Sequence, residues 1–338
     1  MLNGKTIFLT GGTGSFGKKF IQMTLAKYKP KKIIVFSRDE LKQFEMMEKF
    51  PQATHPIRYF LGDVRDLERL RRAMKGSDIV VHAAAYKHVP AAEYNPFEFV
   101  KTNIIGAQNV IEAALDAGVK QVVALSTDKA CNPINLYGAT KLASDKMFVA
   151  ANSYSGEGGP CFSVVRYGNV VGSRGSVIPF FMNQAAKGKL TITDPEMTRF
   201  WITLDEAVSM VWRAMKISKG GEIYVSKIPS MNIMDLAEVV APNLPKEIIG
   251  IRPGEKIHEV MISEDDARYT FEYDNYYAIF PAISNWFSDA LKSGEGKLVP
   301  PNFRYSSEIN PQKLTRADLS KLLSNYVHKG HELVSKND

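Results

Sequence analysis

The chain has 338 residues, a net charge of +7, and a composition that is 45% hydrophobic and 23% charged. This length can bury a sizeable core in two lobes, and the scattered basic residues do not predict a nucleic-acid-binding surface. The N-terminus lacks a signal-peptide pattern, no apolar run of about twenty residues could span a membrane, and two cysteines suit a reducing cytoplasm.

Short apolar runs alternate with helical patterns through the first half of the chain. The runs are rich in Val and Ile and occupy residues 6–11, 31–38, 57–64, 78–85 and 120–127. Most are continuous rather than alternating, which is typical of strands buried on both faces of a parallel sheet. We therefore expect an α/β fold with a Rossmann-like doubly wound parallel sheet, extended by a sixth strand at 162–170.

The pattern changes in the second half, where glycine and proline interrupt it at Gly172, Gly175 and Pro179. Helices are expected at 203–216 and 232–241, and the last forty or so residues predict a loop, a capped helix and a frayed end. We expect a dinucleotide-binding domain over 1–170, with 199–226 packing back onto it. Residues 171–338 then form a smaller α+β lobe that binds the substrate.

A glycine-rich loop, LTGGTGSFG, follows the first strand and opens a helix. Gly11 allows a tight turn, Gly14 lets the backbone approach a pyrophosphate, and Gly17 lets the helix lie close to the sheet. This context predicts a dinucleotide site rather than an ordinary turn. Its expected cofactor-binding residues are Gly11, Thr13, Gly14, Ser15, Phe16 and Gly17.

The end of the second strand bears on the choice of cofactor. Ser37 and Arg38 come first, and an arginine can bind a 2′-phosphate with two hydrogen bonds, so the sequence favours NADP. Asp39, one position later, keeps NAD open. The remaining cofactor-binding candidates are Asp63, Val64, Ala83, Ala84 and Ala85, which follow the third and fourth strands, together with Tyr137 and Lys141.

The stretch STDKACNPINLYGATK, residues 126–141, carries the expected chemistry. Tyr137 and Lys141 are four residues apart and fall on one face of a helix that begins near Leu136. A nearby ammonium group and a cationic nicotinamide ring both favour the phenolate, so Tyr137 could take a proton from a sugar hydroxyl. Thr127 is expected to hydrogen-bond the same hydroxyl.

These motifs resemble the extended short-chain dehydrogenase/reductases that modify nucleotide sugars. Asp128-Lys129 is similar to the pair found in the inverting 4,6-dehydratases of that family, which begin pseudaminic acid biosynthesis. The stretches HAAAYKHVPAAEYNP, MTRFWITLDEAV and GIRPGEKIHE also resemble that subgroup. The resemblance implies an acid at Asp128 and a base at Lys129, which remove water from C5 and C6 of UDP-N-acetylglucosamine once C4 is a ketone.

The resemblance also implies a homo-oligomer, and it implies contacts with the UDP-sugar. The residues matching such positions are Lys87, Asn169, Arg199, Arg252 and Glu255. Arginines on a diphosphate and a carboxylate on ribose hydroxyls fit this chemistry.

Other interpretations of the same residues stay open. Asp128 and Lys129 could form only a surface ion pair, and the chain could be a UDP-hexose 4-epimerase, a C5-retaining dehydratase or a non-catalytic NADP-binding regulator. His82 and His88 lack the neighbouring ligands of a metal site, and a nucleophilic Cys131 is not expected.

Overall fold

The computed structural model describes residues 1–172, 176–282 and 294–328. Clustering of contacts divides the chain into two compact units. The first unit comprises residues 1–167, 204–227 and 261–304. The second comprises residues 168–203, 228–260 and 305–338. The predicted frayed end and Gly175 lie outside the described residues.

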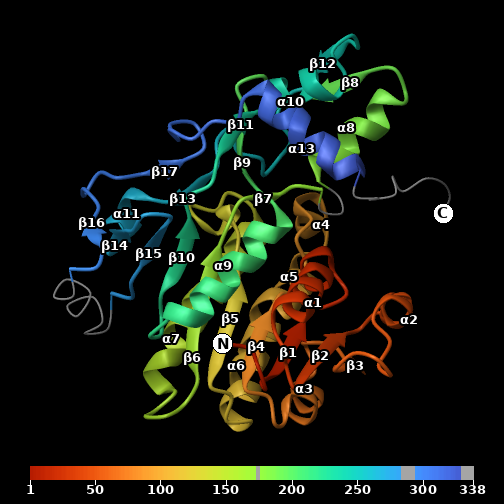
Figure 1. The fold of residues 1–338 in the computed structure, drawn as a ribbon. Coiled ribbons are helices and arrows are strands. Elements are labelled where there is room, and N and C mark those ends of the chain that lie inside the picture. The colour runs from red at the N-terminus through yellow and green to blue at the C-terminus, as the bar shows by residue number, and fades with distance from the viewer. Residues whose placement is uncertain (173–175, 283–293, 329–338) are drawn as a thin grey trace. The chain divides into compact units, whose positions relative to one another are not determined.

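The first unit is built on one 10-stranded sheet in the order β16-β14-β15-β10-β6-β5-β4-β1-β2-β3 (Figure 1). Neighbouring strands from β3 to β10 run parallel, whereas β15, β14 and β16 continue the sheet antiparallel. The strands are β1 (Thr6–Thr10), β2 (Lys32–Ser37), β3 (Ile57–Leu61), β4 (Ile79–His82), β5 (Gln121–Leu125), β6 (Cys161–Arg166), β10 (Ile223–Ser226), β14 (Thr270–Glu272), β15 (Tyr276–Ile279) and β16 (Lys297–Leu298). The doubly wound order 3-2-1-4-5-6 confirms the predicted fold class.

Several helices of the first unit pack against one another. Helix α1 contacts α9, and α6 contacts both α3 and α7. The bounds are α1 (Ser15–Lys27), α2 (Glu40–Lys49), α3 (Leu67–Met74), α4 (Val89–Tyr94), α5 (Pro96–Phe99), the π-helix η1 (Val100–Ile105), α6 (Gly106–Asp116), the 3₁₀ helix η2 (Asp128–Ala130), α7 (Leu136–Tyr154), α9 (Leu204–Ile217) and α11 (Glu264–Ala267). Strand β1 is buried at every position, as its apolar sequence predicts.

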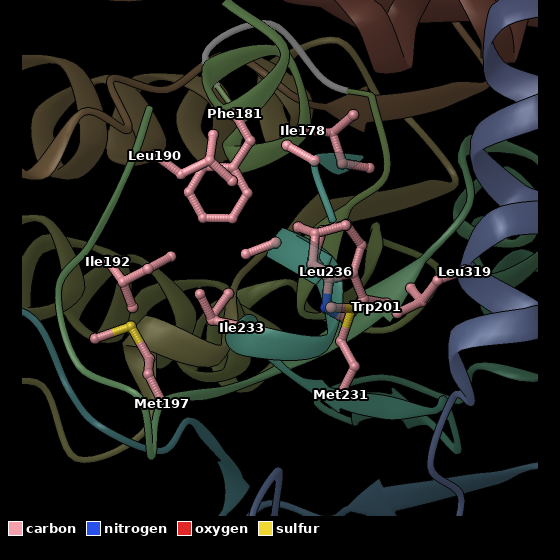
Figure 2. Close-up of a cluster of buried hydrophobic side chains, with 12 residues drawn as sticks. Ile178, Phe181, Leu190, Ile192, Met197, Trp201, Met231, Ile233, Leu236 and Leu319 are labelled. Atoms are coloured by element: carbon pink, nitrogen blue, oxygen red, sulfur yellow. The ribbon is translucent and has the colours of Figure 1, made fainter. Parts of the chain in front are cut away.

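The second unit has small sheets and three helices among its described residues. Its elements are β7 (Asn169–Val170), α8 (Val177–Ala185), β8 (Leu190–Ile192), β9 (Thr198–Ile202), β11 (Ser230–Asn232), α10 (Ile233–Val240), β12 (Lys246–Ile248), β17 (Tyr305–Ser306) and α13 (Arg316–His328), and β13 (Val260–Ile262) spans the unit boundary. Figure 2 shows its core, where Phe181 of α8, Trp201 of β9 and Leu236 of α10 meet.

The observed boundaries correct the predicted ones at two places. Residues 261–304 were expected in the smaller lobe, but they belong to the first unit because β14, β15 and β16 extend its sheet. The expected sixth strand at 162–170 ends at Arg166, and β7 begins a separate sheet. Gly168 lies at this break, where an added Cβ would sit 2.5 Å from Phe200 Cβ, so close packing of the backbone fixes the turn.

Candidate active site

The glycine loop has the geometry that a dinucleotide requires. Gly11 has a φ of +65°, and an added Cβ would lie 2.8 Å from the backbone of Ala83. A Cβ on Gly17 would lie 2.3 Å from the carbonyl oxygen of Gly12, so α1 approaches the loop as closely as backbone allows. Gly14 is exposed at the N-terminus of α1, whose first turn has no acidic residue and no side-chain cap. These features fit a pyrophosphate bound by backbone N–H groups.

A buried hydrogen-bond junction fixes the alanine loop beside the glycines. The Thr10 hydroxyl accepts from the N–H groups of Ala83 at 3.1 Å and Ala84 at 3.2 Å, and its oxygen lies 2.9 Å from Nδ1 of His82. Because both lone pairs of the hydroxyl are used, its proton is donated to His82 Nδ1, which places the imidazole proton on Nε2. Burial and the charge of Lys141 lower the pKa of His82 to about 3, so the ring is neutral.

The predicted cofactor residues at the end of β2 contact other side chains of the first unit. The Thr13 hydroxyl hydrogen-bonds Ser37 at 2.9 Å, and the Arg38 guanidinium lies 4.7 Å from the ring centre of Tyr86. Asp39 caps α2 by accepting from the Lys42 N–H at 3.0 Å and also pairs with the Lys42 ammonium.

Asp63 and Val64, predicted beside the adenine, are held by neighbouring side chains. Asp63 binds Arg65 through both carboxylate oxygens, and these bonds lower the pKa of its carboxyl against the opposing effect of burial. The Val64 carbonyl accepts from the Asn109 amide at 3.0 Å. Val64 is buried, and a Cβ on Gly106 would lie 2.8 Å from its side chain, so the glycine gives it room.

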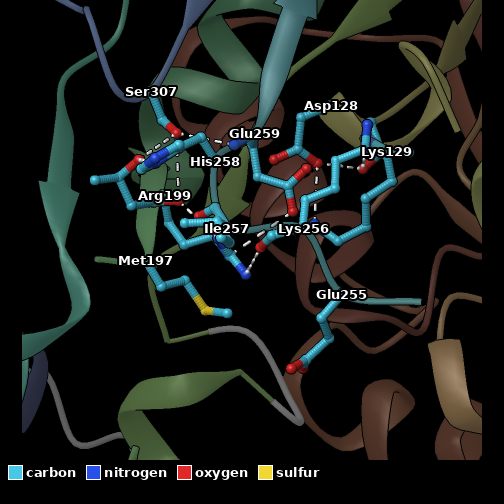
Figure 3. A network of polar contacts seen from close by, with 12 residues as sticks. Asp128, Lys129, Met197, Arg199, Glu255, Lys256, Ile257, His258, Glu259 and Ser307 are labelled. Atoms are coloured by element: carbon cyan, nitrogen blue, oxygen red, sulfur yellow. Dashed lines mark hydrogen bonds and ion pairs between the residues drawn. The ribbon is translucent and has the colours of Figure 1, made fainter. Parts of the chain in front are cut away.

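The predicted acid and base are in contact directly after β5. Lys129 Nζ lies 3.1 Å from Asp128 Oδ1 (Figure 3). The Thr127 hydroxyl donates to the same oxygen at 2.8 Å. The Asp128 side chain is 1% exposed and that of Lys129 is 24% exposed. The alternative of a surface ion pair is therefore wrong for Asp128, because the carboxylate is buried.

Tyr137 and Lys141 lie on α7 as predicted, and the helix begins at Leu136 behind an Asn135 cap. Burial raises the pKa of Tyr137 to about 12, while the charge of Lys129 and a hydrogen bond with Thr127 lower it. We expected the Lys141 ammonium to favour the phenolate. In the structure, Lys129 is instead the cation that lowers this pKa, whereas Lys141 Nζ donates to the Leu125 carbonyl at 2.8 Å.

Lys87 follows the alanine loop, and Asn103 fixes the backbone before it. The Asn103 side chain accepts from the N–H of Tyr86 and donates to its carbonyl, both at 2.9 Å, and also donates to Thr140 on α7 at 3.0 Å. Desolvation and the charge of Lys129 lower the pKa of Lys87. Asn103 was not among the predicted residues. It lies in a π-helical turn, a feature that is often found at functional sites but is visible only in the structure.

In the second unit, Arg199 is bound to the backbone of the segment that carries Glu255. Its Nη1 donates to the carbonyls of Thr198 at 2.7 Å and Ile257 at 2.9 Å, and its Nη2 donates to that of Lys256 at 2.9 Å (Figure 3). Arg199 is buried, so most of its donors are used within the unit. This arrangement gives it a structural task that the prediction of a direct substrate contact did not include.

The other predicted substrate residues of the second unit are partly exposed. Arg252 is half-exposed and pairs with Glu255, whose Oε2 is buried without a hydrogen-bond partner among the described residues. Asn169 on β7 pairs with Trp201 on β9, two residues from Arg199. Within the described ranges, no three His, Cys, Asp or Glu side chains are grouped to hold a metal ion. None of the described helices is long and apolar enough to cross a membrane.

The strand order, the glycine loop and the Tyr137/Lys141 pair on α7 together define an extended short-chain dehydrogenase/reductase. The family model described as "Polysaccharide biosynthesis protein" matches residues 7–281, and the chain belongs to this family.

Named relatives agree with this assignment. The chain is 57% identical over 331 residues to a Campylobacter jejuni protein named "UDP-N-acetylglucosamine 4,6-dehydratase (inverting)", which covers 96% of this chain and 98% of that protein. It is 41% identical to a "UDP-glucose 4-epimerase" of Rickettsia akari, over 94% of this chain and 95% of that protein. Among solved structures, "X-ray structure of Pen from Bacillus thuringiensis" is similar with a TM-score of 0.88 and 39% identity, over 97% of this chain and 99% of that one.

Proposed function

We propose that this protein is a lyase that converts UDP-N-acetylglucosamine to a 4-keto-6-deoxy sugar with inverted configuration at C5. The observation that carries the proposal is the contact between Asp128 and Lys129 directly after β5. Tyr137 and Lys141, the pair typical of a dehydrogenase site, follow on α7. The 57% identity to an inverting dehydratase over nearly the whole chain supports the same activity.

The first step needs a base for the C4 hydroxyl. Tyr137 takes this proton, and Thr127, which already hydrogen-bonds the phenol, holds the hydroxyl in place. NADP, when bound, accepts hydride from C4 and returns it at C6, so the cofactor is regenerated in each turnover. The low-dielectric position of Tyr137 means that a nearby positive charge is needed to form its anion, and Lys129 supplies one.

The second step needs an acid and a base together. Once C4 is a ketone, Lys129 removes the proton from C5 and Asp128 protonates the C6 hydroxyl, which leaves as water. A single proton passed from Lys129 to Asp128 turns their ion pair into this neutral base and protonated acid. Because the two groups touch, the exchange needs no rearrangement of the chain. C5 then receives a proton from solvent on the face opposite to the one from which Lys129 took the first, which inverts its configuration.

We further propose NADP rather than NAD as the cofactor. An NAD site needs a free carboxylate for the ribose hydroxyls, but Asp39 is used as the cap of α2 and as the partner of Lys42. Arg38 lies on the face of Tyr86 with Nη1 3.7 Å from Asp63, and its guanidinium is the group that would bind a 2′-phosphate.

The candidates for substrate binding are Lys87 in the first unit and three residues of the second unit. Arg252 provides a half-exposed guanidinium, Glu255 a largely buried carboxylate and Asn169 an amide. Arg199 supports them by holding the backbone at Lys256 and Ile257. The assembly is proposed to be a homo-oligomer, on family resemblance, and its location the cytoplasm, which the low cysteine content favours.

The 4-epimerase is the second candidate, because a relative with that name is 41% identical. An epimerase shares C4 oxidation but has no use for the acid and base at Asp128 and Lys129. Mass spectrometry of the purified protein with UDP-N-acetylglucosamine separates the candidates. We expect a product lighter by one water with no net reduction of NADP. A product of unchanged mass would indicate the epimerase, and no conversion would favour a binding protein.

A further inference from the structure

The segment that ends β5 binds α7 through consecutive residues. The Leu125 carbonyl accepts from Lys141 Nζ at 2.8 Å, and the Ser126 hydroxyl donates to Asp145 Oδ2 at 2.6 Å. Lys141 and Asp145 are one helical turn apart on the same face of α7. The strand end therefore fixes both charged side chains, although only Lys141 belongs to the proposed reaction.

Asp145 lies among buried cations. Lys141 is 3% exposed, Arg166 is 2% exposed and Asp145 is 1% exposed. Arg166 Nη2 lies 3.4 Å from Asp145 Oδ2, and its Nη1 donates to the Met261 carbonyl at 2.8 Å and lies 3.5 Å from Asp266. Since a buried charge without a counter-charge is costly, Asp145 has to balance Lys141 and share Arg166 with Asp266.

Burial and the neighbouring charges shift the pKa values of Lys141 and Asp145. Burial lowers the pKa of the Lys141 ammonium, and the charge of Asp145 raises it. Burial raises the pKa of Asp145, whereas Arg166, Lys141 and the Ser126 hydrogen bond lower it. Burial is the larger effect on both groups, so the pKa of Lys141 is lowered and that of Asp145 is raised. Arg166 and Ser126 oppose the shift of Asp145, and the Asp145 carboxylate opposes the shift of Lys141.

We propose that Asp145, whose carboxylate is bound by Ser126 and Arg166, is a supporting residue that supplies the buried counter-charge of the Lys141 ammonium and so keeps it charged during catalysis. The inference rests on the proposed function only in giving Lys141 a part in the reaction. Asp145 itself touches neither substrate nor cofactor in this scheme. It acts through Lys141.

The other titratable groups that face Lys141 change charge far from neutral pH. His82 on β4 has a pKa lowered to about 3, mainly by burial. Tyr137, one turn earlier on α7, has a pKa raised to about 12, also by burial. Arg166 on β6 stays charged, because the pKa of its guanidinium is raised above its ordinary value. A change observed at Lys141 between these limits therefore reports on Lys141 and Asp145.

The test compares Asp145→Asn, Asp145→Glu and a surface control, Asp116→Asn on α6, where Asp116 pairs with Arg71. The Cε signal of ¹³C-labelled lysine, assigned to Lys141 with a Lys141→Met variant, is followed against pH without substrate. We expect Asp145→Asn to lower the Lys141 inflection by about one pH unit or more. Asp145→Glu should restore most of it, and Asp116→Asn should leave it unchanged. An unchanged inflection in Asp145→Asn would overturn the proposal.

A second readout is the pH profile of kcat/KM. Where turnover needs the Lys141 ammonium, a lower Lys141 pKa moves the alkaline limb of the profile to lower pH in Asp145→Asn. The NMR titration needs no substrate, so it decides the role of Asp145 even if the enzyme acts on a different sugar. If Asp145→Asn does not fold, Ser126→Ala decides the question. A lowered inflection would support the proposal, and the wild-type inflection would contradict it.

Discussion

The two units treat charged residues differently. In the first unit, Asp128 and Lys129 follow the end of β5 and contact each other, and Tyr137 and Lys141 lie on α7. In the second unit, Arg199 was expected to bind substrate, yet three backbone carbonyls take its donors. An arginine can donate hydrogen bonds to backbone carbonyls as well as to a phosphate, so residue type alone does not separate binding from support.

The largest effect is expected in the first unit, from Tyr137→Phe. Removing the phenol removes the base for the C4 hydroxyl, so kcat should fall by about 10³-fold or more. Initial rates of keto-sugar formation measure this, with NADP affinity as a check on the fold. Tyr154→Phe, at the exposed end of the same helix, is the matched control and should keep full activity. Equal rates for the two variants would remove Tyr137 from the mechanism.

Lys129→Ala should separate the two steps of the reaction. Without the base for C5, dehydration should fall by about 10²-fold, while C4 oxidation continues more slowly because Tyr137 loses a favourable charge. Single-turnover absorbance then reveals reduced nicotinamide that persists. Lys146→Ala, an exposed lysine on α7, serves as the control. Unchanged product formation by Lys129→Ala would contradict the assignment.

The second unit should respond through stability. Arg199→Met removes the buried guanidinium donors to the carbonyls of Lys256 and Ile257, so the free energy of unfolding should fall by about 1–3 kcal/mol. Arg252→Ala, which breaks only an exposed ion pair, should cost less than about 0.5 kcal/mol and raise KM instead. Chemical unfolding and substrate titration of both variants provide the comparison. A stable Arg199→Met protein with a raised KM would return Arg199 to direct binding.

A smaller effect is expected from pH acting on His82. Its pKa is about 3 in the folded protein against an ordinary 6.5, so the unfolded chain binds a proton more readily. The stability from the neutral ring is complete above pH 6.5 and is lost as pH falls, by at most about 1.4 kcal/mol per unit. Between neutral and mildly acidic pH, the free energy of unfolding should therefore fall more steeply with decreasing pH for wild type than for His82→Asn. Parallel curves would argue against a neutral buried ring.

How much could be predicted from the sequence follows from how local each signal is. The buried strands, the glycine loop and Tyr-x-x-x-Lys are short patterns, and their positions were predicted. The return of residues 261–304 to the first sheet could not be, because strand pairing over such separations leaves no local trace. Asp145 carried a weak signal, an acid one turn after Lys141. Its partner Arg166 is twenty-one residues further on, in another strand.

The measurement that tests the account most directly is proton NMR of the reaction in deuterated water. Removal of the C5 proton by Lys129 and its replacement from solvent on the other face predict a new C6 methyl signal, deuterium at C5, and couplings of the inverted sugar. A methyl signal with unchanged C5 configuration would contradict the use of Lys129 proposed here. Conversion to the C4 epimer without a methyl signal would contradict the dehydratase itself.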